Sequence, residues 1–270
     1  MKLCRFQPLE FSIRNVGRSG NEVHAQTLNG ILEDGSVFEI RGDFFGARER
    51  TGRKWAADQV KFLPPSVPTK IVGVGRNYHE HVKEFNNPVP KEPVIFLKPP
   101  SSILAPEDPI VVPAISQRVE YEGEIAVIIG KRCFHVRQDE DVKPYILGYT
   151  ALNDVTARDL QRADLQWIRG KGFDTFCPFG DVLETDHPPP DTQVETRVNN
   201  VTKQSAPIGE MIFPIHFLIR WITQVMTLEP GDVIATGTPG GVGPLVPGDV
   251  VEVSVSNIAI LRNPVVVPQN

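Results

Sequence analysis

Three glutamates alternate along one short segment of the chain. Glu120, Glu122 and Glu124 lead directly into the apolar run at residues 125–129. Because side chains alternate along a strand, we expect the three carboxylates on one face of a single strand, where they repel one another and lose solvation. A bound cation or proton uptake would compensate for this charge. The alternative that the pattern leaves open is a strand whose polar end reaches solvent.

A further carboxylate follows about thirty residues later. Asp154 is predicted to open a helix over residues 155–167, where an aspartate is commonly no more than a cap. Together with Glu122 and Glu124, however, it offers an all-oxygen ligand set without cysteine or histidine. Hard divalent cations prefer such sets, so the pattern favours Mg²⁺, with Mn²⁺ or Ca²⁺ as alternatives, over Zn²⁺.

A candidate acid–base pair lies in the segment GRNYHEHVKE (75–84). Asn77 is a suitable helix N-cap, and the helix that it predicts places His81 and Glu84 three residues apart on one face. A carboxylate that fixes the imidazole tautomer makes such a pair a candidate general base. A solvated helix face rich in charge is the alternative.

Two glycine-rich segments carry groups suited to an anion. Lys171 lies between two glycines, which let the backbone approach a ligand and leave the ammonium free. Thr238 lies in the loop at residues 235–244, where its hydroxyl and the neighbouring N–H groups can bind a carboxylate. For this loop, a plain connection is an equal alternative.

Short strands must position these groups. The chain has 25 proline and 22 glycine residues in 270, which indicates many turns rather than a helix bundle. Prolines at 64, 65 and 68 mark a boundary. We therefore predict an α+β, mostly β chain, with a small N-terminal α+β module at residues 1–65 and a catalytic domain at 66–270.

Individual elements follow from local patterns. Asp34 and Gly35 predict the tight turn of a hairpin over residues 30–40, and the charged stretch 41–61 is expected to end in a short helix. The remaining expectations are strands at 70–75, 93–98 and 122–129, a buried helix at 215–228, and two Pro-Gly-Asp-Val turns at 230–233 and 247–250 that each feed a strand.

Composition excludes several classes of protein. The net charge of −5 and pI near 5.7 provide no basic surplus for nucleic acid. The longest apolar runs have about five residues, whereas a membrane helix needs about 20. The charged N-terminal segment does not resemble a signal peptide, and three scattered cysteines predict neither zinc nor disulfides. We expect a cytoplasmic protein that binds neither nucleic acid nor membrane.

Taken in order, six segments resemble the fumarylacetoacetate hydrolase family. Any one motif is weak, but six in this order are specific, and they cover roughly residues 68–262. The resemblance implies a mixed β-roll catalytic domain, usually in a homodimer. The six segments are GRNYHEHVKE (75–84), PVIFLKP (93–99), YEGEIAVIIGKRC (121–133), NDVTARDLQ (153–161), RGKGFDTFCPFG (169–180) and GDVIATGTPGGVG (231–243).

The resemblance also implies roles for single residues. It implies a divalent cation held by Glu122, Glu124 and Asp154, and a water-activating His81 and Glu84 on a mobile lid helix. At position 120 this chain has a glutamate, whereas the diketo-acid hydrolases carry a histidine at the matching position. The residues whose implied role is to bind the substrate are Lys171, which also counts among the catalytic residues, and Arg76, Tyr78, Arg158, Gln161 and Thr238.

The leading interpretation is a divalent-metal-dependent hydrolase of C–C bonds in small 2,4-diketo acids (acylpyruvates), acting through an enolate that the cation stabilises. Decarboxylation of oxaloacetate and isomerisation of 2-hydroxyhepta-2,4-diene-1,7-dioate share that enolate and stay as alternatives. A non-catalytic β domain that binds a cation or a small acid is the alternative from another class. Such a domain would not need His81, Glu84 and Lys171. The expected partner is a small 2-oxo or diketo acid.

Overall fold

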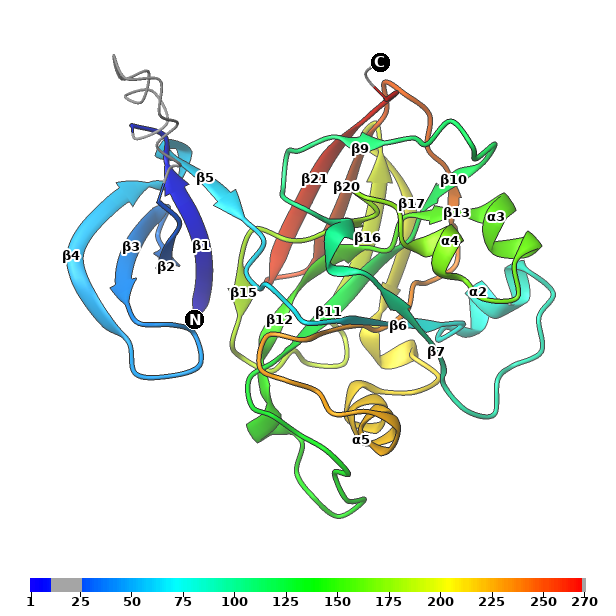
Figure 1. Ribbon diagram of the computed structural model, residues 1–270, viewed down its shortest axis with the longest axis horizontal. Helices are drawn as coiled ribbons and strands as arrows, with labels where there is room; N and C mark the ends of the chain where they lie inside the picture. The colour runs from blue at the N-terminus through cyan, green and yellow to red at the C-terminus, as the bar shows by residue number, and fades with distance from the viewer. Residues whose placement is uncertain (11–25, 269–270) are drawn as a thin grey trace.

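Four β-sheets form the scaffold of the chain, whose computed structural model describes residues 1–10 and 26–268 (Figure 1). The strands are β1 (Lys2–Pro8), β2 (Leu28–Glu33), β3 (Ser36–Arg41), β4 (Glu49–Ala56), β5 (Val60–Leu63), β6 (Ile71–Gly75), β7 (Val94–Lys98), β8 (Ile103–Leu104), β9 (Ile110–Val111), β10 (Val119–Tyr121), β11 (Gly123–Ile129), β12 (Ile146–Asn153), β13 (Thr156–Ala157), β14 (Cys177–Pro178), β15 (Leu183–Glu184), β16 (Gln193–Val198), β17 (Val201–Pro207), β18 (Val233–Ala235), β19 (Gly243–Pro244), β20 (Val250–Val255) and β21 (Ala259–Val266). The helices are α2 (His79–Glu84), α3 (Arg158–Ala163), α4 (Ile168–Lys171) and α5 (Ile215–Val225), with 3₁₀ turns η1 (Ala57–Gln59), η2 (Pro100–Ser102), η3 (Lys143–Tyr145) and η4 (Ile208–Glu210). The predicted α+β, mostly β class is confirmed.

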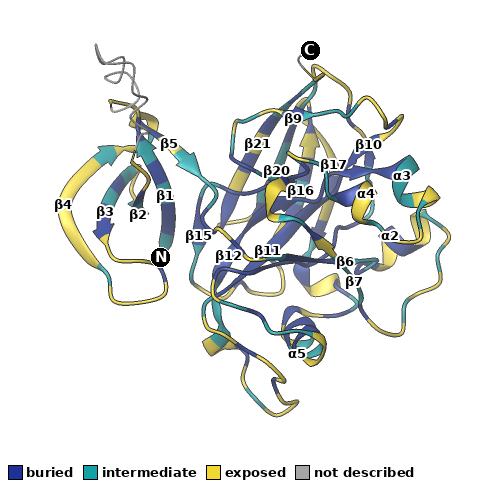
Figure 2. Cartoon of the chain, viewed as in Figure 1, coloured by how far each residue is buried: buried dark blue, intermediate teal, exposed yellow. Residues whose placement is uncertain are grey.

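The N-terminal strands β1–β5 form a lobe at one side of the molecule (Figure 1). The predicted hairpin is present as β2–β3, and both turn residues, Asp34 and Gly35, have positive φ as a tight two-residue turn requires. The charged stretch that follows is mainly strand β4, exposed along nearly its whole length (Figure 2), and the expected short helix is the 3₁₀ turn η1. The first residues of β1 pair with β15, which joins the lobe to the main sheet.

Strand β11 lies inside the main, 11-stranded sheet, between β12 and β18. All seven of its residues are buried, because alternate side chains enter two different apolar clusters on the two faces of the sheet. This explains why its sequence reads as a continuous apolar run rather than an alternating one. Helix α5 packs into the larger of these clusters, as its sequence predicts. Both Pro-Gly-Asp-Val turns precede strands, β18 and β20.

Two predicted elements are wrong in ways that matter for the site. The expected single strand is broken at Glu122, with β10 in a three-stranded sheet and β11 in the main sheet. Asp154 does not open a helix; it follows strand β12, and its N–H bonds to the carbonyl of Glu122 at 2.8 Å. Helix α3 begins only at Arg158, because Thr156 and Ala157 pair with β10.

Helix α2 also begins later than its sequence indicates. Its N-cap is Tyr78, not Asn77. The Asn77 side chain is buried and bonds instead to both backbone groups of Phe213 and to the carbonyl of Thr236. Within the described residues, no helix is long and apolar enough to cross a membrane.

Candidate active site

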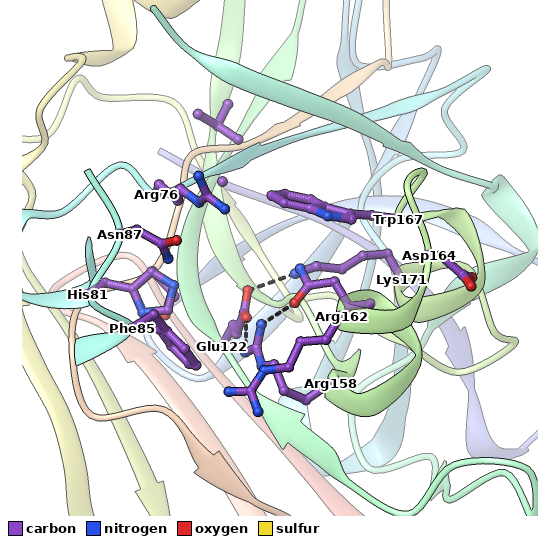
Figure 3. Close-up of a pocket in the computed structure, with 14 residues that line it drawn as sticks. Arg76, His81, Phe85, Asn87, Glu122, Arg158, Arg162, Asp164, Trp167 and Lys171 are labelled. Atoms are coloured by element: carbon purple, nitrogen blue, oxygen red, sulfur yellow. Dashed lines mark hydrogen bonds and ion pairs between the residues drawn. The ribbon is translucent and has the colours of Figure 1, made fainter. Parts of the chain in front are cut away.

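A cavity of about 480 Å³ opens beside α2, α3 and α4 (Figure 3). Its lining includes predicted residues from four separate segments: His81, Glu122, Arg158 and Lys171, joined by Arg76, Gln161 and Thr238. The fold therefore collects into one cavity most of the side chains that the motifs single out.

Glu122, Glu124 and Asp154, here called the acidic triad, lie together, with Glu122 in the lining of this cavity and the other two buried beside it. One oxygen of each carboxylate lies within 4.8 Å of the others, and all three residues are buried. The break between β10 and β11 turns Glu122 toward Asp154 at the end of β12, while the pairing of Glu124 with Leu152 keeps β11 and β12 in register. The triad can bind a metal ion, and its all-oxygen chemistry fits a hard divalent cation.

Two lysines compensate for the charge of the triad. The Lys171 ammonium donates to Glu122 Oε2 at 2.8 Å and also bonds to Asp154. Lys98 is fully buried, and its Nζ lies 2.7 Å from Asp154 Oδ1. The sequence analysis missed Lys98, although a lone charged residue at the end of the apolar strand β7 is a usable signal. A buried lysine needs a carboxylate partner nearby.

The pKa values of two triad carboxyls are shifted in opposite directions. Burial, Asp154 and Glu122 together raise the pKa of Glu124 well above its usual range, although the Gly237 N–H donates to its Oε2 at 2.8 Å. Burial also opposes ionisation of Glu122, but Lys171 and Arg158 lower the pKa of that carboxyl below its usual range. Glu124 is therefore the member whose charge most lacks compensation, and a cation supplies what the protein does not.

Glu120 lies apart from the triad and is fully buried. Its two oxygens accept from Arg158 Nε at 2.6 Å and Arg118 Nε at 2.5 Å. Arg158 reaches on to Glu122 and donates to Gln161 Oε1 at 2.6 Å (Figure 3). Glu120 thus orients the Arg158 guanidinium toward the cavity, where a histidine would make a weaker partner for it.

His81 and Glu84 lie on α2, as predicted. The distance from His81 Nδ1 to Glu84 Oε2 is 3.5 Å, and Glu84 also accepts from the Gly241 N–H at 3.2 Å. Within the described chain, Nδ1 of His81 has no closer hydrogen-bond partner, and Phe85 packs edge-on against the ring. A small rotation of either side chain would shorten this distance to a hydrogen bond.

Thr238 and Tyr78 are placed differently. Thr238 lines the cavity, where its hydroxyl donates to the Gly123 carbonyl at 2.9 Å and accepts from Gln204. Tyr78 is buried on the other side of α2, in the lining of a second hollow, so the structure does not bring it to the cavity that holds the triad. Arg162, which the sequence analysis did not name, does line that cavity.

Comparisons with known proteins assign the chain to a family. Residues 70–266 match the model described as "Fumarylacetoacetate (FAA) hydrolase C-terminal", and residues 25–65 match "Rv2993c-like, N-terminal". The chain belongs to the fumarylacetoacetate hydrolase family. Members of this family are enzymes that use divalent metals, so the chain is a family enzyme and its buried triad can hold such an ion.

Three similar proteins illustrate the range of the family. Human mitochondrial oxaloacetate tautomerase FAHD2A is 44% identical over 77% of this chain and 70% of its own length. The structure of 5-carboxymethyl-2-hydroxymuconate delta-isomerase from Mycobacterium smegmatis has a TM-score of 0.87 and 40% identity, over 99% of this chain and 100% of that one. The 2-hydroxyhepta-2,4-diene-1,7-dioate isomerase from Mycobacterium marinum matches with a TM-score of 0.87 and 39% identity over 100% of both chains.

Proposed function

We propose that this chain is a divalent-cation-dependent enzyme, with Mg²⁺ the first candidate, that converts small 2-oxo acids through an enolate. One observation carries the proposal: Glu122, one member of the buried acidic triad, lines a single cavity together with the buried Lys171 and His81. A cation held by Glu122, Glu124 and Asp154 would act as a Lewis acid toward the carboxylate and 2-oxo oxygens of the substrate.

The protein's own groups have separable roles in this proposal. Lys171 supplies positive charge beside the developing enolate oxygen, in a site that excludes water and so strengthens the interaction. Arg158, held by Glu120, and the Thr238 hydroxyl orient the substrate's carboxylate end. His81 moves the proton, with Glu84 supporting the charged imidazolium.

Hydrolysis of an acylpyruvate is the reaction that the His81–Glu84 pair favours. His81 would take a proton from water, the hydroxide would attack the 4-carbonyl, and cleavage of the C3–C4 bond would leave the enolate of pyruvate and a carboxylic acid. The enolate then takes up a proton to give pyruvate, so the proton taken from water is replaced by one added to the product. A carboxylate beside the histidine fixes the imidazole tautomer and supports the imidazolium that this step forms.

Keto–enol conversion of a 2-oxo acid is the second candidate, favoured by the names of the tautomerase and isomerases to which the chain is similar. Here His81 would take a proton from C3, and a proton would then be added to the 2-oxo oxygen (tautomerisation) or to another carbon (isomerisation), without water entering the products. The same cavity groups serve both reactions, because each forms a 2-oxo acid enolate along its course. Oxaloacetate decarboxylation also reaches that enolate and is a third outcome to measure.

A substrate panel tests the proposal. The chain is stripped with chelator, reloaded with Mg²⁺ or Mn²⁺, and assayed with acetylpyruvate, oxaloacetate and 2-hydroxyhepta-2,4-diene-1,7-dioate. We expect cation-dependent turnover of at least one of them, and the product identifies the reaction. Full activity in excess chelator, or no turnover of any 2-oxo acid with either cation, would contradict the proposal.

A further inference from the structure

A second large cavity, here called the α5 cavity, lies beside the first turn of helix α5. Its volume is about 630 Å³, within the range of about 300–1,000 Å³ that is typical of small-molecule sites. Helix α5 lies at the lower edge of the molecule in Figure 1, away from α3 and α4, which border the candidate active site. Of the described residues, none lines both cavities, so the α5 cavity is separate from the candidate active site.

The walls of the α5 cavity are mainly apolar. Three consecutive prolines at 188–190 contribute to its lining, together with Ile146, Met211 and Ile215 from three other segments. Proline has a fixed φ and almost no side-chain freedom to lose, so this part of the wall keeps its shape without a ligand. A preformed apolar wall suits a ligand with an apolar body.

The charged side chains of the α5 cavity carry a surplus of positive charge. Its described lining includes Lys143, His187, His216 and Arg220, with Asp141 as the carboxylate. Asp141 Oδ1 accepts from the Lys143 backbone N–H at 3.1 Å, and within the described residues neither Lys143 nor Arg220 forms an ion pair. Burial, and then the charges of Lys143 and His216, lower the pKa of His187, because these cationic groups lie close together. An anion would relieve their repulsion.

Arg220 has a buried donor without a partner. Its Nη2 donates to the Glu140 carbonyl at 2.7 Å, which fixes the guanidinium, but its Nε is buried and has no hydrogen-bond partner in the described chain. Buried polar groups are nearly always paired, so an unpaired N–H of a cavity-lining arginine offers a place for an acceptor on a ligand. His187 is also oriented in advance, since its Nδ1 lies 2.6 Å from Tyr149 Oη.

The wall of the α5 cavity is bonded to the segment that begins α2. Met211 and Pro214 line the cavity, and the two residues between them both bond to Asn77. The Ile212 N–H donates to the Asn77 carbonyl at 2.8 Å, and the Phe213 N–H donates to Asn77 Oδ1 at 2.8 Å. Asn77 immediately precedes the N-cap of α2. A ligand in contact with this wall would therefore restrain the base of α2 as well.

We propose that the α5 cavity is a regulatory binding site for a small organic anion with an apolar body. Arg220 and Lys143 bind the acidic group, and the proline wall packs against the body. The bound ligand holds the segment that carries Met211 and Pro214, and through Asn77 it restrains α2. This inference goes beyond the proposed function, because neither the acidic triad nor a 2-oxo acid takes part in the binding.

Two fluorescent probes that share one body test the site. 8-Anilinonaphthalene-1-sulfonate carries a sulfonate, and N-phenyl-1-naphthylamine has the same ring system without it. We expect saturable binding of the sulfonate, roughly 10–100-fold tighter than that of the neutral probe, because a hydrogen bond to a charged group contributes that much. Equal affinities of the two probes would overturn the site.

Two variants locate the binding within the molecule. Arg220→Gln should bring the preference for the sulfonate close to one. Arg220 also holds the Glu140 carbonyl, so Lys143→Gln, at an exposed residue, is the variant expected to keep its melting temperature, and it should reduce the preference several-fold. Lys54→Gln, at an exposed residue of β4 outside the cavity, makes the same change of charge and should leave the preference unchanged. A preference that survives both cavity variants would overturn the site.

Amide hydrogen exchange tests the effect on α2. With the sulfonate at ten times its Kd, exchange across residues 79–84 should slow, and linkage limits the effect to roughly tenfold. Unchanged exchange in α2 while the sulfonate is bound would overturn the regulatory role. Neither metal nor 2-oxo acid is present in these experiments, so their outcome is independent of whether the proposed function holds.

Discussion

The acidic triad and helix α2 face the same cavity but are held in very different ways. Each triad carboxylate accepts from lysine, arginine or backbone N–H groups that come from other segments. Helix α2 has six residues, its Glu84 side chain is 32% exposed, and its buried Val82 belongs to none of the three apolar clusters. The groups that bind charge are preorganised, whereas the proposed base lies on an element that little apolar burial restrains.

This difference assigns separate tasks to the two regions. Preorganised carboxylates and lysines lose no orientation when the substrate arrives, so they can stabilise charge from the start. A lightly held α2 can admit the substrate and then bring His81 into range. Changes in the triad should therefore affect every reaction of the enzyme, and changes in α2 should affect the step that needs a base.

The largest effect is expected from the triad. Glu124→Gln should abolish Mn²⁺ binding, measured by electron paramagnetic resonance, and lower kcat by at least roughly 10³-fold. Without metal the variant should have a melting temperature no lower than that of the original protein. The raised pKa of Glu124 means that the folded protein disfavours its ionised form, and glutamine removes that unfavourable charge. Asp139→Asn, at an exposed residue, is the control. Undiminished Mn²⁺ binding by Glu124→Gln would contradict the ligand assignment.

A smaller and more selective effect is expected from α2. Glu84→Gln keeps the side chain's size but removes the charge that supports an imidazolium, so acylpyruvate hydrolysis should fall by roughly 10²–10⁴-fold. Decarboxylation of oxaloacetate needs no activated water and should fall much less. Both rates are measured on the same preparation. Equal losses would mean that the pair closes the site instead of acting as a base.

Asp181, outside the triad, is a half-buried carboxyl whose burial outweighs the nearby charge of Lys2. Burial raises its pKa to about 6, and its Oδ1 has no hydrogen-bond partner among the described residues. Because the folded-state pKa lies above the unfolded one, the free energy of unfolding should fall as pH rises from about 4 to 6, by roughly 2–3 kcal/mol. Denaturant unfolding of Asp181→Asn should show this dependence removed. If the free energy of unfolding depended on pH identically in both proteins, the titrating group would be a residue other than Asp181.

The smallest effect concerns the motion of α2. We predict that residues 78–91 exchange amide hydrogens readily in the free protein and are protected when oxalate binds with Mg²⁺. Linkage limits the added protection to roughly tenfold at a ligand concentration ten times the Kd. Strand β11 serves as the internal reference, since it is buried throughout. Unchanged exchange across 78–91 would mean that the helix is as fixed as the triad.

The sequence predicted the elements whose signals are local. Asp34 and Gly35 specify a hairpin turn by their tolerance of positive φ, and the apolar periodicity of α5 reports its burial. The break at Glu122 and the strand end at Asp154 depend on pairing with residues far along the chain, which no local pattern contains. Arg162 escaped for the same reason, because only the fold brings it to the cavity. Lys98 did leave a local signal, a charged residue at the end of an apolar strand, but its partner Asp154 is again supplied by the fold.

The break between β10 and β11 at Glu122 has a consequence for how the protein folds. Strands β10 and β11 belong to different sheets, and Gly237, which bonds to Glu124, is more than a hundred positions away in sequence. The triad therefore cannot assemble until both sheets and the C-terminal strands have paired, and contacts of such long range form late and slowly. Partly folded chains lack the complete ligand set, so a cation bound at the triad would bind the finished molecule alone and would draw the folding equilibrium toward it. Newly made chains should gain resistance to proteolysis abruptly when Mg²⁺ is present, and only after the last strands have been added.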